Sequence, residues 1–311
     1  MRQRWRLLAF IGILMCMGIV RQSVTEHFRV PQDGEIDLRI PAIRAWGLRQ
    51  LEFEQIMRYL HFADNTAIDV GEDRAAKVRP LLKEFKDCCI KFWVPGKNQA
   101  IDEMMIRFKG RLGWRQYMKD KPIKFGMKIW GMCESQVGYL SNFDLYTGKK
   151  GKTVQKGLAM RVVLKLVTEL LAVHAIWWGG HLYMDNFYTS LPLFIALWVL
   201  GIPACGTLRA KRTGTPDLGV EKSDARDTYE WQALQNHDCH AVCGAWRDNS
   251  VTRFLSTIHD AARKVHKRLR KKRDGGGQVE VNKPLAVLAY TAQMDGCDVG
   301  DQKRSYYATS E

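Results

Sequence analysis

Apolar residues recur at helical spacing through the first hundred positions of the chain. Residues 7–20 form an unbroken apolar run, LLAFIGILMCMGIV, and a helix that is apolar all round is typically a buried one. In LRQLEFEQIMRYLHF the apolar residues fall mostly three or four apart, and Pro80 stands where a first helical turn tolerates proline. These patterns predict a mainly helical opening part, residues 1–95.

The pattern changes to short β-rich runs after residue 96. AIDEMMIRFKG, KFGMKIWGMCE and GYLSNFDLYTG predict three strands, and the amphipathic helix MRVVLKLVTELLA and the strand GGHLYMDNF follow. Ser190 is a good N-cap for the next helix and Gly201 a good end for it, before the strand IPACGTLRA. Three strands, a helix, a strand, a helix and a strand predict an α/β fold with a mixed sheet core in residues 96–210.

Residues 211–283 are more polar and contain three short β-rich runs, YEWQAL, HAVCGAW and TRFLSTI. They predict a β-rich insertion. Within it, residues 263–273 hold eight Lys or Arg in eleven positions. We favour a nuclear localisation signal or a phosphate-binding arm over a solvated loop. The segment KPLAVLAYTAQM, a strand or a helix, leads into the last predicted part, residues 284–311.

Composition narrows the class of protein. The 311 residues are 46% hydrophobic and 26% charged, a globular composition, and their formal charge is +15. A protein this basic most often binds a polyanion, and nucleic acid is favoured over an anionic membrane surface. The eight cysteines are scattered, with Cys88 beside Cys89. This is not the pattern of a secreted disulfide framework, so we expect reduced thiols in the nucleus or cytosol.

The N-terminus argues for a different compartment. MRQRWR followed by the apolar run at residues 7–20 has the charge and hydropathy pattern of a secretory signal peptide. The run is too short to span a bilayer comfortably, and no good small-residue cleavage site follows it. A buried helix accounts for the same apolarity, so we favour a helix and no membrane partner, with secretion as the alternative.

Three aspartates stand where a sheet could bring them together. Asp102 lies in a predicted strand, Asp185 at the end of another, and Asp298 at or before the start of a helix. They are too far apart in the sequence to form a local ion loop. Carboxylates on neighbouring strand ends are nevertheless the oxygen ligands that a pair of divalent cations needs for phosphoryl transfer. The alternative for each aspartate taken alone is a turn residue that bonds the nearby backbone.

The segment HDCHAVC gathers four residues of the types that bind zinc: His237, Cys239, His240 and Cys243. Side chains alternate between the two faces of a strand, so four ligands to one ion would be strained there. We therefore favour an ordinary β-insertion over a zinc site.

The motifs, taken in order, resemble those of the piggyBac transposase family. IDEMMIRFKGR, KFGMKIW, GYLSNFDLYTGK, YMDNFYTSLPLF, GTLRAKR, LSTIH and MDGCDVGDQKRSYY match successive family landmarks across almost the whole chain. WGLRQLEFEQIMRYLHFADN, KVRPLL and VPGKN are similar to the family's helical entry region. Any one block is weak evidence, but the series in the same order is specific, and it favours a packed helix at residues 7–20.

The resemblance implies an RNase H-like core, cut-and-paste DNA transposition and two Mg²⁺ ions as cofactors. Carried over by motif, the metal ligands are Asp102 in IDEMM, Asp185 in MDNFYTS and Asp298 in GCDVGDQ, with Asp301 a further acidic position close to the site. The implied partner is double-stranded DNA at transposon terminal repeats. A second copy of the chain in a homodimer is another candidate partner, and the expected location is the nucleus.

The chain also departs from the family pattern. The block that usually reads close to YNKYMGGVD is YTAQMDGCD here, and Thr291, Asp295 and Cys297, which replace Asn, Gly and Val, are among the changed positions. Family members normally continue beyond the position of Glu311, which leads us to expect that the C-terminal part of the fold is truncated. Two functions follow as expectations: a metal-dependent transposase, and a domesticated or decayed DNA-binding protein without catalysis.

Overall fold

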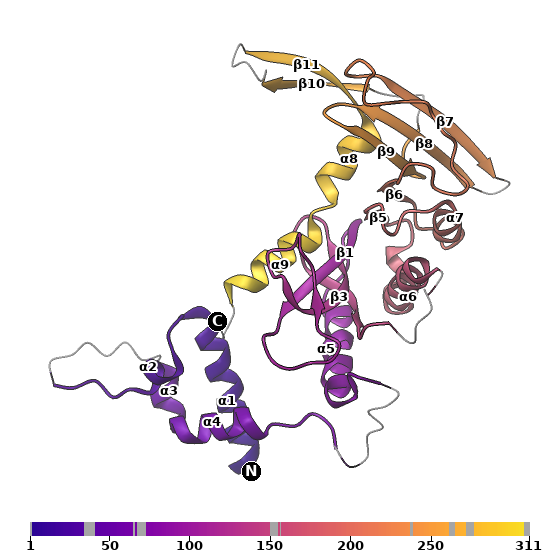
Figure 1. The fold of residues 1–311 in the computed structure, drawn as a ribbon. Helices are drawn as coiled ribbons and strands as arrows, with labels where there is room; N and C mark the ends of the chain where they lie inside the picture. Colours follow the sequence, from indigo (N-terminus) through magenta and orange to yellow (C-terminus); the bar gives the residue numbers. More distant parts are fainter. Residues whose placement is uncertain are drawn as a thin grey trace. The chain divides into compact units, whose positions relative to one another are not determined.

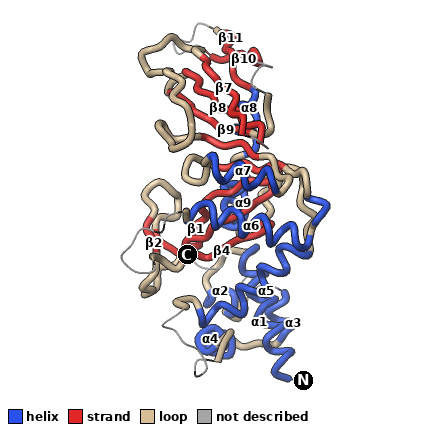
Figure 2. Tube along the Cα trace, turned by 90° about the vertical axis from the view of Figure 1, so that its right-hand side faces the viewer, coloured by secondary structure: helices blue, strands red, loops and turns tan. Residues whose placement is uncertain are grey.

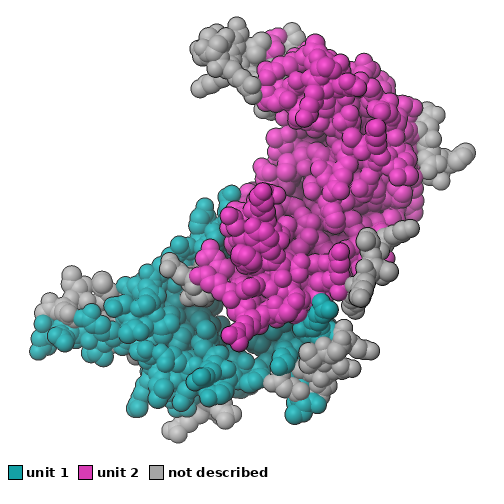
Figure 3. Space-filling model, viewed as in Figure 1, with its two compact units in different colours: residues 1–83, 301–311 teal, residues 84–300 magenta. Residues whose placement is uncertain are grey.

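The computed structural model describes residues 2–33, 41–64, 66, 73–149, 155, 157–236, 239–260, 265–271 and 277–307. The chain divides into two compact units, residues 1–83 with 301–311 and residues 84–300, which are coloured separately in Figure 3. Each unit is considered by itself below. The four-part division made from the sequence remains a prediction.

The described part of the first unit is helical, as the sequence predicts. Its helices are α1 (Arg2–Ile19), α2 (Val24–Phe28), α3 (Pro41–Trp46) and α4 (Gln50–Tyr59), with a 3-10 turn at Ala76–Val78 and the start of α5 (Arg79–Lys91) after them (Figure 1). Phe10 and Ile13 of α1 are buried against Phe53 of α4, and the rings of Phe10 and Phe53 lie 5.1 Å apart.

The helix predicted over residues 7–20 is therefore confirmed as α1, but only one face of it is buried. Leu8 and Met15 are more than half exposed on the other face. Across the described ranges, every helix falls short of the length and apolarity that a membrane span requires.

The second unit is built on one mixed sheet, which Figure 2 shows as a continuous band of strands. Its described strands are β1 (Asn98–Arg107), β2 (Gln116–Tyr117), β3 (Phe125–Glu134), β4 (Leu140–Tyr146), β5 (His181–Met184), β6 (Ala204–Thr207), β7 (Tyr229–Asn236), β8 (Cys239–Arg247) and β9 (Val251–Ser256). They run in the order β2-β3-β1-β5-β6-β9-β8-β7, and β4 also pairs with β3. Only the described pairs β1–β5 and β5–β6 are parallel.

Helices cover both faces of this sheet, which makes β5 apolar on both sides. Leu182 and Met184 face the core formed with α6 (Leu158–Val173) and α7 (Leu191–Val199). Tyr183, between them in sequence, packs instead with α8 (Leu285–Gln293). The period-two alternation of a strand accounts for this division. The central α/β order predicted from the sequence is confirmed.

The three strands predicted between residues 211 and 283 are found as β7, β8 and β9, and β9 pairs with β6, so they extend the main sheet. The described part of the basic run is a strand as well: β10 (Val265–Lys271) pairs antiparallel with β11 (Gln278–Pro284). The segment left open between strand and helix is the helix α8.

The predicted difficulty of a zinc site in HDCHAVC is visible in β8. Cys239 and Cys243 are buried and join the core shared with α6 and α7, whereas His240 is exposed. His237 lies outside the described residues. Alternate residues of the strand therefore point to opposite faces, as expected.

His259, just after β9, predicts a loss of stability in mild acid. Burial lowers the pKa of its imidazole from 6.5 to about 4, and His181 adds to the shift. The folded chain keeps this histidine neutral while the unfolded chain takes up a proton, so stability falls as the pH drops from about 6.5 toward about 4. We expect His259→Asn to remove about 1 kcal/mol of the loss between pH 7 and pH 5, after allowance for partial exposure.

The measurement is urea unfolding of both proteins at the two pH values. His240→Asn, on the exposed side of β8, is the control. An identical loss of stability in His259→Asn and the unmodified chain would contradict the prediction.

Candidate metal centre

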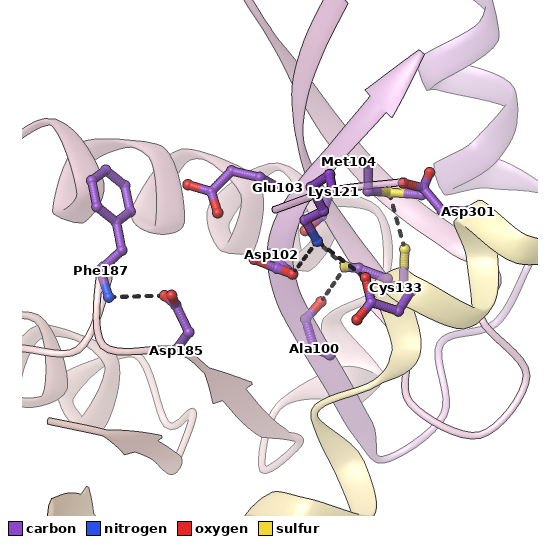
Figure 4. A network of polar contacts seen from close by, with 12 residues as sticks. Ala100, Asp102, Glu103, Met104, Lys121, Cys133, Asp185, Phe187 and Asp301 are labelled. Carbon is purple, nitrogen blue, oxygen red and sulfur yellow. Dashed lines mark hydrogen bonds and ion pairs between the residues drawn. The ribbon is translucent and has the colours of Figure 1, made fainter. Parts of the chain in front are cut away.

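The parallel pairing of β1 with β5 brings two of the predicted ligands together. Ile101 on β1 is paired with Met184 on β5, so the next residues along the two strands are Asp102 and Asp185. One carboxylate oxygen of each, together with one of Glu103, lies within 4.8 Å of the others. Figure 4 shows Asp102 and Glu103 on β1 and Asp185 just after β5. Asp185 follows the end of its strand as the sequence analysis expects, whereas Asp102 lies in the middle of β1.

Asp185 is held by the turn that follows β5. Its Oδ1 accepts a hydrogen bond of 2.9 Å from the backbone N–H of Phe187, and its carbonyl accepts one of 2.8 Å from the Thr189 hydroxyl. The turn interpretation of this aspartate is therefore realised, and it also fixes the carboxylate beside Asp102. Burial raises the pKa of Asp185, and the charge of Asp102 adds to the rise.

Glu103 is an acidic neighbour that the sequence analysis missed. Strand alternation predicts that Glu103 points away from Asp102, yet an oxygen of each belongs to the same close group. Its Oε1 pairs with Lys128 Nζ at 3.0 Å, and both side chains are nearly buried. The signal available in the sequence was the adjacency of Asp and Glu in IDEMM, where the second carboxylate needs only a bend of its side chain to approach the first.

Asp298 is positioned by the helix α9 (Gly296–Tyr306), in whose first turn it lies. The Sγ of Cys297 is 3.5 Å from the carbonyl oxygen of Ala100 on β1 and 3.4 Å from that of Gly131 on β3. At Gly296 the helix approaches the backbone so closely that an added Cβ would lie 2.9 Å from the carbonyl oxygen of Glu134. These contacts attach the start of α9 to β1 and β3.

Asp298 is joined to Asp102 through a lysine rather than by direct proximity. Lys121 Nζ donates to Asp102 Oδ2 at 2.8 Å and to Asp298 Oδ1 at 3.0 Å. The Lys121 side chain is 18% exposed, whereas that of Asp298 is 51% exposed. Figure 4 shows the ammonium of Lys121 beside the Asp102 carboxylate.

The charge state of this lysine follows from its two partners. Burial by itself would lower the pKa of Lys121, but Asp102 and Asp298 outweigh it and the pKa is raised above its usual value. Burial also raises the pKa of Asp102, and Lys121 only partly opposes that rise. The ammonium of Lys121 has two carboxylate oxygens within 3.0 Å and therefore stays protonated at neutral pH.

The other two aspartates of MDGCDVGDQ lie on or next to the same helix. Asp301, three residues after Asp298, pairs with Arg304 at 2.9 Å. Asp295 is exposed at the junction of α8 and α9. Neither belongs to the close carboxylate group found among the described residues. Asp301 as a ligand stays a prediction, as do the ligand roles of Asp102, Asp185 and Asp298.

The donor set of the close group fits a divalent cation of the hard class. Asp102, Glu103 and Asp185 offer carboxylate oxygens, which Mg²⁺, Mn²⁺ and Ca²⁺ prefer, and none of the three brings a thiolate or an imidazole. Three acidic residues at one sheet edge could therefore hold a metal ion.

The sheet order, its covering helices and the acidic group define the class of fold as RNase H-like. The chain has the fold of a piggyBac transposase solved in a synaptic complex with hairpin DNA, with a TM-score of 0.73 and 24% identity. The match covers 98% of this chain and 60% of that one.

A family model described as Transposase IS4 matches residues 4–310, and the chain belongs to this family, in its piggyBac branch. It is 30% identical over 314 aligned residues to PiggyBac transposable element-derived protein 3 of Homo sapiens, covering 97% of this chain and 50% of that protein. It is also 30% identical to PiggyBac transposable element-derived protein 2 of Homo sapiens, covering 96% and 49%. The chain thus spans about half the length of these relatives.

The close contact at Gly296 predicts that Gly296→Ala displaces the start of α9. Because the added Cβ would meet a backbone oxygen rather than a flexible side chain, we expect the free energy of unfolding to fall by about 1–3 kcal/mol. Urea unfolding measures the change. Gly113→Ala is the matched control, since nothing lies within 4 Å of a Cβ there. Equal stability of the two variants would contradict the close contact.

Proposed function

We propose that the chain carries the catalytic core of a piggyBac-type transposase, which cleaves and joins DNA strands at transposon ends. Asp102, Asp185 and Asp298 hold the two Mg²⁺ ions of this reaction, and Glu103 is the acidic neighbour that completes the group. The single observation that carries the proposal is the register of β1 with β5, which places Asp102 and Asp185 side by side on neighbouring parallel strands within the fold of a transposase.

In the proposed phosphoryl transfer, metal ions and protein residues have separate roles. Bound divalent ions supply Lewis acidity to the attacking and leaving oxygens of a phosphoryl transfer. The chain's own residues hold and orient: β1 and β5 fix two carboxylates, the Phe187 N–H sets the rotation of Asp185, and Cys297 attaches the helix that carries Asp298.

A groove beside Asp185 supports DNA as the substrate. It has a volume of about 480 Å³ and combines aromatic rings with cations. Phe187 and Tyr188, which follow Asp185 in sequence, line it together with Tyr146, Arg209 and Arg212. Arginine binds phosphate through paired donors, and aromatic faces stack on unpaired bases. The formal charge of +15 adds a sequence-independent attraction to DNA.

Further proposals concern partners and location. The solved relative in a synaptic complex with hairpin DNA supports double-stranded terminal repeats as partners of this chain. We propose the nucleus as its location, supported by the basic run at residues 263–273. A homodimer stays a prediction from the family resemblance.

The catalytic proposal predicts that Asp185→Asn abolishes metal-dependent cleavage. The amide keeps the shape of the side chain but loses the charge that a divalent cation requires, so we expect nicking of a terminal-repeat duplex in Mg²⁺ to fall at least about 100-fold. Gel analysis of a labelled duplex measures it. Asp144→Asn is the control, because Asp144 pairs with Lys165 away from the carboxylate group. Equal cleavage by Asp185→Asn and the unmodified chain would refute the assignment.

DNA binding without catalysis is the second candidate function. The observation that favours it is the engagement of Asp102 and Asp298 by Lys121, which neutralises part of the acidic group while the chain as a whole stays strongly basic. Salt-sensitive DNA binding with no cleavage in Mg²⁺ or Mn²⁺ supports this candidate. Measurable strand transfer excludes it.

The groove predicts which cations contact phosphate. We expect the affinity for a short duplex to fall linearly on a log–log plot against salt, and Arg212→Ala to reduce the slope by about one. Fluorescence anisotropy at several KCl concentrations measures the slope. Lys165→Ala, on α6 and paired with Asp144, is the control. A slope unchanged by Arg212→Ala would remove this arginine from the DNA contact.

A further inference from the structure

Lys121 occupies the position between two proposed metal ligands. It lies in the turn between β2 and β3, far in sequence from both partners, and its ammonium contacts Asp102 at 2.8 Å and Asp298 at 3.0 Å. Apart from this ammonium, the described contacts show nothing that links the carboxylate on β1 to the carboxylate on α9. The Lys121 and Asp102 side chains are mostly buried, so water screens this ion pair less than the pair with Asp298, whose side chain is half exposed.

A divalent cation and this ammonium need the same oxygens. Asp102 Oδ2 and Asp298 Oδ1 are the atoms that Lys121 contacts, and a metal ion bridging these two residues would need carboxylate oxygens of both. The ammonium group has three N–H donors, so it can donate hydrogen bonds to both carboxylates when no metal is bound. Two positive charges close together between the same oxygens repel each other, so occupation by one opposes occupation by the other.

Lys128, the other lysine that pairs with this acidic group, is held differently from Lys121. Lys128 pairs with Glu103 at 3.0 Å, and its ammonium also lies over the rings of Trp130 and Phe187, 5.7 and 5.6 Å from their centroids. It is held by aromatic faces as well as by charge. Lys121 is held by the two proposed ligands themselves, on a turn rather than within a long strand.

We propose that Lys121 is a built-in counter-ion that competes with divalent metal for Asp102 and Asp298. Without metal it keeps the carboxylates of β1 and α9 together; when metal binds, it leaves them. The proposal rests on the proposed function for the identity of the metal ligands. It adds that this positioning residue raises the metal concentration at which the site fills.

Metal binding to the full chain, without DNA, tests the proposal. Mn²⁺ is the probe, with free Mn²⁺ followed by electron paramagnetic resonance during titration of the unmodified chain, Lys121→Met and Lys121→Arg. We expect Lys121→Met to lower the apparent Kd for Mn²⁺ about tenfold, because one competing charge is removed. Lys121→Arg restores the charge and is expected to bind Mn²⁺ like the unmodified chain.

The matched control is Lys165→Met, which removes another lysine–aspartate pair of the same unit, with Asp144. Its Mn²⁺ affinity is expected to be unchanged. Lys121→Gln repeats the test with a polar side chain, so that a folding defect in one variant, monitored by circular dichroism, does not decide the result.

The outcomes separate this inference from the proposed function. Unchanged or weaker Mn²⁺ binding in both Lys121→Met and Lys121→Gln overturns the competition, and so does the absence of saturable binding in every variant. Tighter binding in Lys121→Met together with no DNA cleavage by any variant supports the competition and overturns the catalytic proposal instead.

Discussion

The parallel pairing of β1 with β5 is the constraint on which the acidic site depends. A parallel pair joins strands that are distant in the chain, and its register decides which residues share an edge. Here Ile101 pairs with Met184, and the next step along both strands places Asp102 beside Asp185. A slip of one residue would turn one of the two aspartates to the other face of the sheet. β5 is held in this register by helices on both sides: Leu182 and Met184 pack with α6 and α7, and Tyr183 packs with α8.

The same register brings several negative charges close together, and neighbouring lysines pair with them. Burial raises the pKa of Asp102 and of Asp185, and the charge of a neighbouring carboxylate adds to each rise, so the charged state is disfavoured. Two lysines supply the opposing charge: Lys128 to Glu103, and Lys121 to Asp102 and Asp298. The first is anchored on aromatic rings, and the second sits on a turn. The negative charge of the acidic group is thus paired with one cation held in place, Lys128, and one on a turn, Lys121, which we propose can move away.

Local patterns were sufficient to predict the elements that carry the aspartates, but not all the contacts at their ends. The alternation in IDEMMIRF and the short apolar run before MDNF indicate strands that bury one or both faces, and these became β1 and β5. The position of Glu103 near Asp102 was not predicted, because strand alternation describes the direction of the Cβ atoms only. A long side chain such as glutamate can bend back toward its neighbour. The ion pairs of Lys121 were not predicted either, because a lysine in a turn is ordinarily exposed to solvent. Its two partners are brought to it by tertiary packing.

The placement of Asp298 depends on backbone shape more than on charge, so Asp298 keeps its position at the start of α9 although the block YTAQMDGCD is altered. At Gly296 the helix α9 approaches the end of β3, where an added Cβ would lie 2.9 Å from the carbonyl oxygen of Glu134. At Gly300 it approaches the turn after β3, where an added Cβ would lie 2.8 Å from the carbonyl oxygen of Gly138. These glycines are four apart and share one helix face. Asp295, which stands where the family usually has glycine, is exposed and outside this contact. The glycine that the packing requires is the one that this chain keeps, so the extra carboxylate leaves the start of α9 in place.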